Sequence, residues 1–250
     1  MKKSLPIIIR QLLARLCFGG ISTFRRRRQQ LASRWLTGYG IEMGALHNPL
    51  AVSAKSQVTY VDRMDIEGLR RHYPELSKES LIPVDIIDDG EFLTKFSDES
   101  QDFIVANHFL EHCENPIGAV AAWLRVLRLG GIAYVAVPDK RFTFDYARPA
   151  TTWQHVLRDW RKGFLWSREE HYREWAKLVE NTPPGEINAR VQKLTNIGYS
   201  IHFHVWTSQT LQEFFHRCKT ELSLPFTICE FVRNDREIIV VLKKVEEPYV

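Results

Sequence analysis

From about residue 40 onward, segments with the apolar pattern of strands alternate with segments with the apolar pattern of helices. A nearly continuous apolar run over Leu81–Ile87 is typical of a parallel strand that is covered on both faces. Five segments are expected to be strands of one sheet: Tyr39–Met43, Val58–Val61, Leu81–Ile87, Asp102–Ala106 and Ile132–Val137. Strands that alternate with helices predict a mainly parallel sheet with helices on both faces.

The clearest helix follows the fourth predicted strand. Asn115 suits the capping position, Pro116 suits the first helical position, and Gly130 suits the residue after the end. Apolar residues at helical spacing mark its buried face: Ile117, Val120, Ala121, Leu124 and Leu127. We therefore expect a helix that ends at the Gly130-Gly131 turn, where the fifth strand begins.

Residues 139–200 interrupt this alternation and are interpreted as an insertion. The stretch is rich in aromatic residues and arginines. Ser167 and Glu170 have the spacing of a capping box, which predicts a helix that runs through Glu180.

The last part of the chain predicts a helix and a hairpin. Thr207 or Ser208 can cap the helix. The apolar segments Phe226–Val232 and Glu237–Lys243 flank a polar turn and predict two antiparallel strands. The whole pattern predicts a Rossmann-like α/β fold: a mostly parallel seven-stranded sheet with a C-terminal antiparallel hairpin and helices on both faces. Such sheets bind ligands at the carboxyl ends of their strands.

The charge of the chain is distributed unevenly. Residues 1–41 contain nine Lys or Arg and no Asp or Glu; because the whole chain carries +4, residues 42–250 carry −5. Residues 1–39 are therefore interpreted as a basic amphipathic helical arm, and residues 40–250 as one domain with an insertion at about 139–200. The arm either packs on the domain or lies on an anionic membrane surface. An acidic domain makes nucleic acid an unfavoured partner.

Cysteine usage and the arm together bear on location. Four scattered cysteines without a C-x-x-C pair favour a reducing compartment: Cys17, Cys113, Cys218 and Cys229. Arg10 and Arg15 interrupt the apolar stretch of the arm, which is too short to span a bilayer. We expect a cytoplasmic protein; an arm packed on the domain is the favoured interpretation, and a peripheral contact of the arm with the inner face of the membrane is the alternative.

Polar residues stand at the ends of the predicted strands. Glu42 and Gly44 end the first strand. Asp62 ends the second, where an acidic side chain can accept hydrogen bonds from both ribose hydroxyls of a nucleoside. Asp85, at the third strand, is placed to accept from an adenine amino group, and Asn107 follows the fourth. The sequence thus predicts a nucleoside-binding edge.

The order of these motifs resembles the class I methyltransferases that use S-adenosylmethionine (SAM). Three segments carry the resemblance: Glu42-Met43-Gly44, Leu110-Glu111-His112, and Leu127-Arg128-Leu129-Gly130-Gly131 followed by a strand and Pro138. The likeness covers about residues 40–140. More narrowly, the chain looks like bacterial methyltransferases found near glycan-assembly enzymes.

The resemblance implies SAM as methyl donor and a role for each strand end. Glu42 and Gly44 would line the methionine side, Asp62 the ribose and Asp85 the adenine. The segment that begins at Asn107 would face the transferred methyl group.

Two departures from the family pattern concern the first motif. Leu46 occupies the position of the family's second glycine. Only thirteen residues separate Gly44 from Val58, which leaves little room for the usual helix after the first strand. We expect an unusual loop here, with the N-terminal arm filling the gap left by the shortened helix.

Histidines near the fourth strand are candidate catalytic residues. His108, His112 and His204 can each serve as a base for a hydroxyl acceptor, because imidazole titrates near neutral pH. The segment is similar to the Glu-x-x-Glu-His motif of small-RNA 2′-O-methyltransferases and ubiquinone-pathway O-methyltransferases, which helps hold a metal. Here His108 stands in place of the first Glu. A divalent metal is therefore not favoured, and Glu111 and His112 are expected to hydrogen-bond the loop.

The insertion is expected to select the acceptor. Its aromatic residues and arginines could stack on and grip a sugar, nucleotide or phosphorylated group. They are Tyr146, Trp153, Trp160, Trp166, Tyr172, Trp175, Arg141, Arg148, Arg158 and Arg173.

Three functions follow from these observations. The first is a SAM-dependent O-methyltransferase that acts on a small or glycan-like acceptor. The second is a degenerate scaffold or binding protein that keeps the fold without catalysis. The third is a nicotinamide-dependent oxidoreductase, which the missing G-x-G-x-x-G disfavours, because a pyrophosphate needs glycines beside a helix N-terminus.

Overall fold

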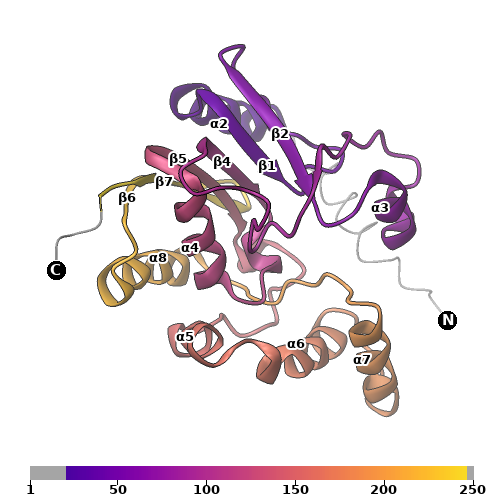
Figure 1. The fold of residues 1–250 in the computed structure, drawn as a ribbon. Coiled ribbons are helices and arrows are strands. Elements are labelled where there is room, and N and C mark those ends of the chain that lie inside the picture. The colour runs from indigo at the N-terminus through magenta and orange to yellow at the C-terminus, as the bar shows by residue number, and fades with distance from the viewer. Residues whose placement is uncertain (1–20, 247–250) are drawn as a thin grey trace.

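The computed structural model describes residues 21–246 and contains one seven-stranded sheet (Figure 1). The strands are β1 (Gly38–Met43), β2 (Ser56–Asp62), β3 (Ile86–Ile87), β4 (Gln101–Asn107), β5 (Leu127–Pro138), β6 (Phe226–Asn234) and β7 (Glu237–Lys244). Their order in the sheet is β3-β2-β1-β4-β5-β7-β6, with β1 to β5 parallel and β7 antiparallel to both of its neighbours. The predicted Rossmann-like fold is confirmed.

Helices lie on both faces of the sheet and beyond one of its ends (Figure 1). The α-helices are α2 (Ile21–Trp35), α3 (Ile66–His72), α4 (Pro116–Val126), α5 (Trp153–Lys162), α6 (Leu165–Leu178), α7 (Ile187–Asn196) and α8 (Ser208–Leu222). Single 3₁₀ turns are η1 (Pro74–Leu76), η2 (Leu110–His112), η3 (Lys140–Phe142) and η4 (Pro184–Glu186). No helix among residues 21–246 is both long and apolar enough to cross a membrane.

Helix α2 and the residues that lead from it to β1 cover one face of the sheet. Leu31, Ala32 and Leu36 pack with Phe103 and Tyr134 of β4 and β5. No helix stands between β1 and β2, so α2 takes the place that a helix after β1 would fill. The rest of the predicted arm, including Lys2, Lys3, Arg10, Arg15 and Cys17, lies outside the described residues.

The opposite face forms the larger core with α4 and α8. Ile117 and Trp123 of α4 and Phe214 of α8 pack against Ile104 and Val135 of the sheet. The local signals of both helices act as predicted, because each capping side chain bonds a free amide of the first turn. The Asn115 side chain accepts from Gly118 N, and Thr207 accepts from Thr210 N.

Three local predictions were wrong. Only Ile86–Ile87 of the predicted third strand pairs with β2; Pro83 lacks the amide that a longer ladder needs. The strand β5 begins at Leu127, directly after α4, because Leu127 pairs with Gln101 of β4. Helix α6 begins at Leu165 without a capping side chain.

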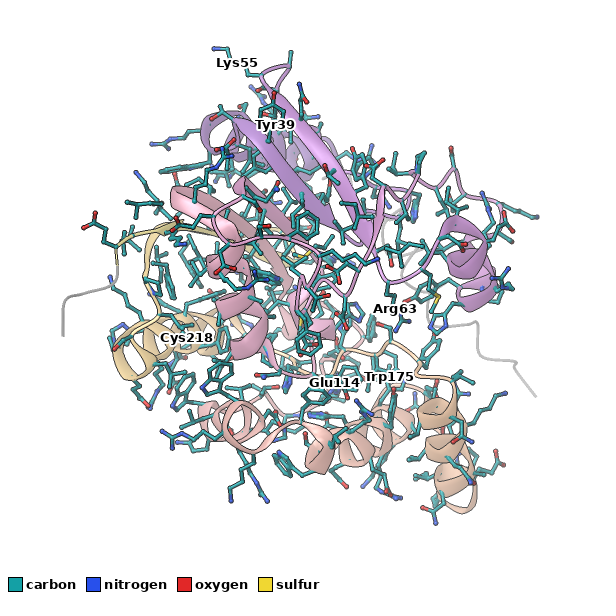
Figure 2. The ribbon with its side chains drawn as sticks, in the orientation of Figure 1. Tyr39, Lys55, Arg63, Glu114, Trp175 and Cys218 are labelled. Carbon is teal, nitrogen blue, oxygen red and sulfur yellow. The ribbon has the colours of Figure 1, made fainter. Side chains whose placement is uncertain are left out.

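The insertion forms a separate layer of helices. An isolated bridge between Asp139 and Trp206 joins its two ends, and we call residues 139–206 the cap. A small core of its own holds the cap helices together: Tyr172, Trp175, Val179, Val191, Leu194, Ile201 and Phe203. Glu114 and Trp175 lie where the cap meets the sheet domain (Figure 2).

Candidate active site

The predicted nucleoside-binding residues gather at one edge of the sheet. The parallel register pairs Glu42 with Tyr60 of β2 and with Val105 of β4, so the ends of these three strands are level. Asp88 N donates to Asp62 O at 3.0 Å and brings the end of β3 alongside. Glu42, Asp62 and Asn107 therefore share one edge.

Glu42 closes the loop after β1. Its carboxylate is 1% exposed, and both of its oxygens lie 3.0 Å from the Leu50 amide that donates to them. Asn107 Nδ2 donates to the same carboxylate at 3.4 Å. Burial raises the pKa of Glu42 to about 7, against the effect of these hydrogen bonds. The carboxyl thus anchors the loop at its far end.

Leu46 keeps the turn that a glycine would otherwise favour. Its φ is +50°, beside +63° at Gly44. A left-handed conformation costs a residue with a side chain about 1–2 kcal/mol. The Leu46 carbonyl accepts from Ile82 N at 2.7 Å, and its side chain packs with Leu69 and Leu76. These contacts hold the altered motif in a sharp turn.

The acidic residues of β2 and β3 have different tasks. Asp62 Oδ1 accepts from Arg63 N at 2.8 Å, and burial raises the pKa of Asp62 to about 6. Asp85 Oδ2 accepts from Tyr60 N at 2.8 Å, so this carboxylate extends the pairing of β2. The exposed acid that follows the observed β3 is Asp89, which sequence reasoning missed. The run Ile86-Ile87 before two acids was the signal for it.

Gly44 and Gly90 lie against Phe109, which follows β4, and we call these three residues together with Asn107 the cradle. The ring of Phe109 lies over both glycines: a Cβ added at Gly90 would meet it at 2.6 Å, and one at Gly44 at 3.4 Å. Asn107 Oδ1 is buried and has no hydrogen-bond partner in the described structure. A buried oxygen of this kind is ready to accept a hydrogen bond from a ligand.

His108 is held by a carboxylate. Its backbone has φ +51°, and its Nε2 lies 2.7 Å from Glu237 Oε2. The imidazole is 38% exposed, whereas Glu237 is 1% exposed and also pairs with Arg28 of α2. Burial opposes ionisation of Glu237, but the hydrogen bonds from Arg28 and His108 outweigh it and lower the Glu237 pKa to about 2. His108 therefore rests against a permanent negative charge.

A second acid and two more histidines lie beside His108. Glu111 is 1% exposed, and neither of its carboxylate oxygens has a hydrogen-bond partner in the described structure; burial raises its pKa. Ligand atoms of Glu111, His112 and His202 all lie within 4.8 Å of one another. We call His108, Glu111, His112 and His202 the sheet-edge group.

Two hydrogen bonds fix the orientation of these histidines. His112 Nδ1 donates to the Ile201 carbonyl at 2.8 Å, and burial lowers the His112 pKa to about 3. His202 Nδ1 lies 2.7 Å from Asp145 Oδ2. Burial opposes protonation of His202, but Asp145 overcomes it and raises the His202 pKa, while the pKa of Asp145 falls to about 2.

His204 lies elsewhere. It is fully buried among His155, Asp159 and His171, and we call these four residues the cap group. Burial lowers the pKa of His204 well below its usual value. The structure thus brings His108 and His112 together, but it places His204 in a different cluster.

The aromatic residues of the cap divide into two kinds. Tyr172 and Trp175 are buried in the cap core. Phe142 and Tyr146, in the loop after β5, are 39% and 72% exposed. The guanidinium of Arg233, near the end of β6, lies 4.5 Å from the centre of the Phe142 ring. This loop follows the end of β5, the strand next to β4, and offers aromatic and cationic groups to a ligand.

Comparisons with known proteins agree with this geometry. Residues 38–135 match the family model of a methyltransferase domain. A putative S-adenosylmethionine-dependent methyltransferase from Methanococcus maripaludis is 13% identical, with a TM-score of 0.49 and 100% of this chain and 98% of that chain covered. A protein from Rhodobacter sphaeroides described as a putative Zn-dependent alcohol dehydrogenase is 14% identical, with a TM-score of 0.53 and coverage of 88% and 90%. At 14% identity, the likeness to the Rhodobacter sphaeroides protein shows the fold alone. No curated protein matches the chain significantly.

Proposed function

We propose that this chain, whose residues 38–135 match the family model of a methyltransferase domain, is a SAM-dependent methyltransferase that methylates a hydroxyl group of a small, glycan-like acceptor. The observation that carries the proposal concerns His108, the residue directly after β4. Its imidazole is half-exposed, and its Nε2 lies 2.7 Å from the Glu237 carboxylate. A hydroxyl acceptor needs a base, and a base needs a carboxylate of this kind to orient it.

The cradle at the strand ends fits SAM, which supplies an activated methyl group on a sulfonium sulfur. The fit rests on the buried, unpartnered Asn107 Oδ1 and on the glycines under Phe109. We propose that Asn107, with Gly44 and the loop that Glu42 closes, receives the methionine part. Asp62 would receive the ribose hydroxyls, and Asp89 rather than Asp85 the adenine amino group.

His108 acts as the general base. Because a carboxylate only accepts hydrogen bonds, Nε2–H donates to Glu237 and Nδ1 is left to accept the acceptor's hydroxyl proton. The deprotonated acceptor oxygen would then be free to take the methyl group that bound SAM would supply, with S-adenosylhomocysteine as the leaving product. The ionised Glu237 stabilises the imidazolium that results, as its low pKa ensures at neutral pH.

The loop after β5 favours a glycan-like acceptor. Sugar rings stack on exposed aromatic side chains such as Phe142 and Tyr146. Arg233 and Arg141, within 4.5 Å and 5.5 Å of the Phe142 ring, add groups suited to a phosphate or acidic sugar.

We also propose a cytoplasmic protein with peripheral contact at the inner membrane face. The proposed contact rests on the basic residues before Ile21.

The first experiment is calorimetric titration of the protein with SAM and with S-adenosylhomocysteine. We expect micromolar binding that Asp62→Ala weakens by more than about 100-fold, because two charge-assisted hydrogen bonds are lost. Asp89→Asn should weaken binding, while Asp85→Asn should leave it unchanged. A folded protein that binds neither ligand would contradict the proposal and favour a scaffold.

The second experiment tests the base with a panel of sugar acceptors. His108→Gln should lower kcat by about 10²–10⁴-fold, the usual contribution of a general base, while SAM affinity stays unchanged. Equal activity of His108→Gln and the parent protein would overturn the role of His108.

A further inference from the structure

We propose that His155, Asp159, His171 and His204 bind one zinc ion that joins helices α5 and α6 to the returning end of the cap. These residues come from three segments: His155 and Asp159 from α5, His171 from α6, and His204 from the stretch before α8. One ligand atom from each of the four lies within 4.8 Å of the other three.

The distances within the cap group suit a tetrahedral ion. With bonds of about 2.0–2.1 Å, two zinc ligands stand about 3.4 Å apart. His155 Nε2 lies 3.0 Å from His171 Nε2 and 3.3 Å from Asp159 Oδ2. The three imidazole rings also face one another edgewise, with centroids 4.9–5.5 Å apart.

Two polar atoms of the cap group are buried without a hydrogen-bond partner in the described structure. They are Asp159 Oδ2 and His204 Nδ1. A buried polar atom without a hydrogen-bond partner destabilises the fold, because it has lost its contacts with water. The competing arrangement is a hydrogen bond between the facing nitrogens of His155 and His171, which uses a single proton and satisfies neither of these atoms. A bound cation accepts the lone pairs of the carboxylate and the imidazoles together.

The surroundings hold the ligands in place in the way that metal sites require. Asp159 Oδ1 accepts from Ser167 Oγ at 2.8 Å, which leaves Oδ2 directed at the histidines. His204 Nε2 donates to the Glu114 carbonyl at 3.3 Å. Ligands oriented by such second hydrogen bonds are the rule at metal sites.

The donor set selects the metal. Three imidazoles and one carboxylate are typical of zinc, whereas magnesium and calcium take oxygen ligands in larger numbers. All four positions are supplied by the protein, so the ion is structural.

The position of the cap group determines which segments a bound ion would hold together. His204 N donates to the Glu111 carbonyl at 3.2 Å, and His202 of the sheet-edge group lies two residues before His204. Arg168 of α6 pairs with the Glu114 carboxylate at 2.5 Å, next to the same junction (Figure 2). A metal bound to His204, α5 and α6 therefore fixes the cap against the residues that follow β4.

The test is the metal content of the untagged protein, purified without chelator and measured by mass spectrometry in the absence of SAM. We expect about one zinc per chain, lost in His171→Gln and in Asp159→Asn. His202→Ala and Glu111→Gln, from the sheet-edge group, and His216→Ala, an exposed histidine of α8, should keep it. Zinc that disappears with the sheet-edge variants but persists in His171→Gln would overturn the assignment.

A spectroscopic readout covers variants that do not fold. Dialysis of the parent protein against a chelator and then cobalt chloride should give the intense visible absorption of tetrahedral cobalt(II), together with a melting temperature that falls on chelation and returns with zinc sulfate. A folded parent protein that takes up neither zinc nor cobalt overturns the proposal. Because these measurements involve no methyl transfer, they stand or fall apart from the proposed function.

Discussion

The sheet-edge group and the cap group use similar residues in opposite electrostatic settings. In the sheet-edge group, His202 has Asp145 and His108 has Glu237, and both carboxyls have their pKa lowered to about 2. In the cap group, three histidines share Asp159, whose pKa burial raises to about 6. In the sheet-edge group, Glu237 and Asp145 are each also paired with an arginine, whereas Asp159 of the cap group is paired with histidines.

This difference teaches how burial acts on a histidine cluster. A buried imidazole becomes charged only where a carboxylate repays its desolvation, as Asp145 does for His202. Where none does, burial keeps the rings neutral, which is the form that binds a metal. In our two proposals, the same residue types therefore serve proton transfer in the sheet-edge group and metal binding in the cap group.

We expect the largest loss of stability from a substitution of Arg148, because this residue bonds to His202 of the sheet-edge group and to its partner Asp145. It is 1% exposed and donates to Asp145 at 2.9 Å, to Glu174 at 2.6 Å and to the His202 carbonyl at 2.7 Å. Arg148→Met leaves a buried carboxylate without its guanidinium, and we expect a loss of about 3–5 kcal/mol in urea denaturation.

The matched control for Arg148 is Arg173→Met. Arg173 pairs with Glu169, which is 71% exposed, and a surface pair of this kind is worth less than about 1 kcal/mol. Equal losses in the two variants would show that the Asp145 network does not stabilise the fold.

Glu237 makes the sheet-edge group sensitive to acid. Its folded pKa of about 2 lies below the usual 4.5, so its contribution is complete above about pH 4.5 and is lost as the pH falls toward 2. We expect a loss on the order of 2 kcal/mol between pH 6 and pH 3, measured by urea denaturation, and a flatter profile for Glu237→Gln. Glu230→Gln, which removes the exposed pair with Arg34, should keep the parental profile; a parental profile for Glu237→Gln would contradict the prediction.

Two serines sharpen the comparison at a smaller scale. Ser167 orients Asp159 in the cap group, and Ser200 Oγ lies 3.1 Å from His112 Nδ1 in the sheet-edge group. Ser167→Ala should weaken zinc binding about 10-fold in a competition titration, as expected for a residue that positions a ligand. Ser200→Ala should leave zinc affinity unchanged. Equal effects of both substitutions would mean that the two groups are not independent.

The smallest expected effect concerns the acceptor. Phe142→Ala should raise the acceptor KM several-fold at unchanged kcat, because stacking contributes to binding only. Trp160→Ala, which removes a 40% exposed ring of α5, should leave KM unchanged. The reverse result would move the acceptor to the outer side of the cap.

Much of the fold could be predicted because its signals are local. Asn115 and Thr207 cap their helices through bonds to residues three positions on, which a sequence displays directly. The short β3 was overestimated because its apolar run does not reveal how much of it finds a partner. That error also drew attention to Asp85 and away from Asp89.

The cap group could not be found in the same way. Its ligands stand at 155, 159, 171 and 204, on three elements that only the fold brings together. The spacing of His155 and Asp159, four apart on one helix face, was visible, but such a pair is common without a metal. His204 was singled out for its chemistry, and its neighbours could be identified only from tertiary structure.

The position of α2 also bears on the order in which this chain can fold. Arg28 reaches Glu237 across 209 residues of sequence, and Arg34 reaches Glu230 across 196. During synthesis α2 leaves the ribosome well before its ionic partners on β6 and β7. Contacts this distant in sequence form late, because the closure of a long loop must come before they can stabilise anything. Helix α2 can therefore pack on Phe103 and Tyr134 before its two ion pairs with the hairpin exist. The hairpin, made later, then locks in place a helix that is already docked on the sheet.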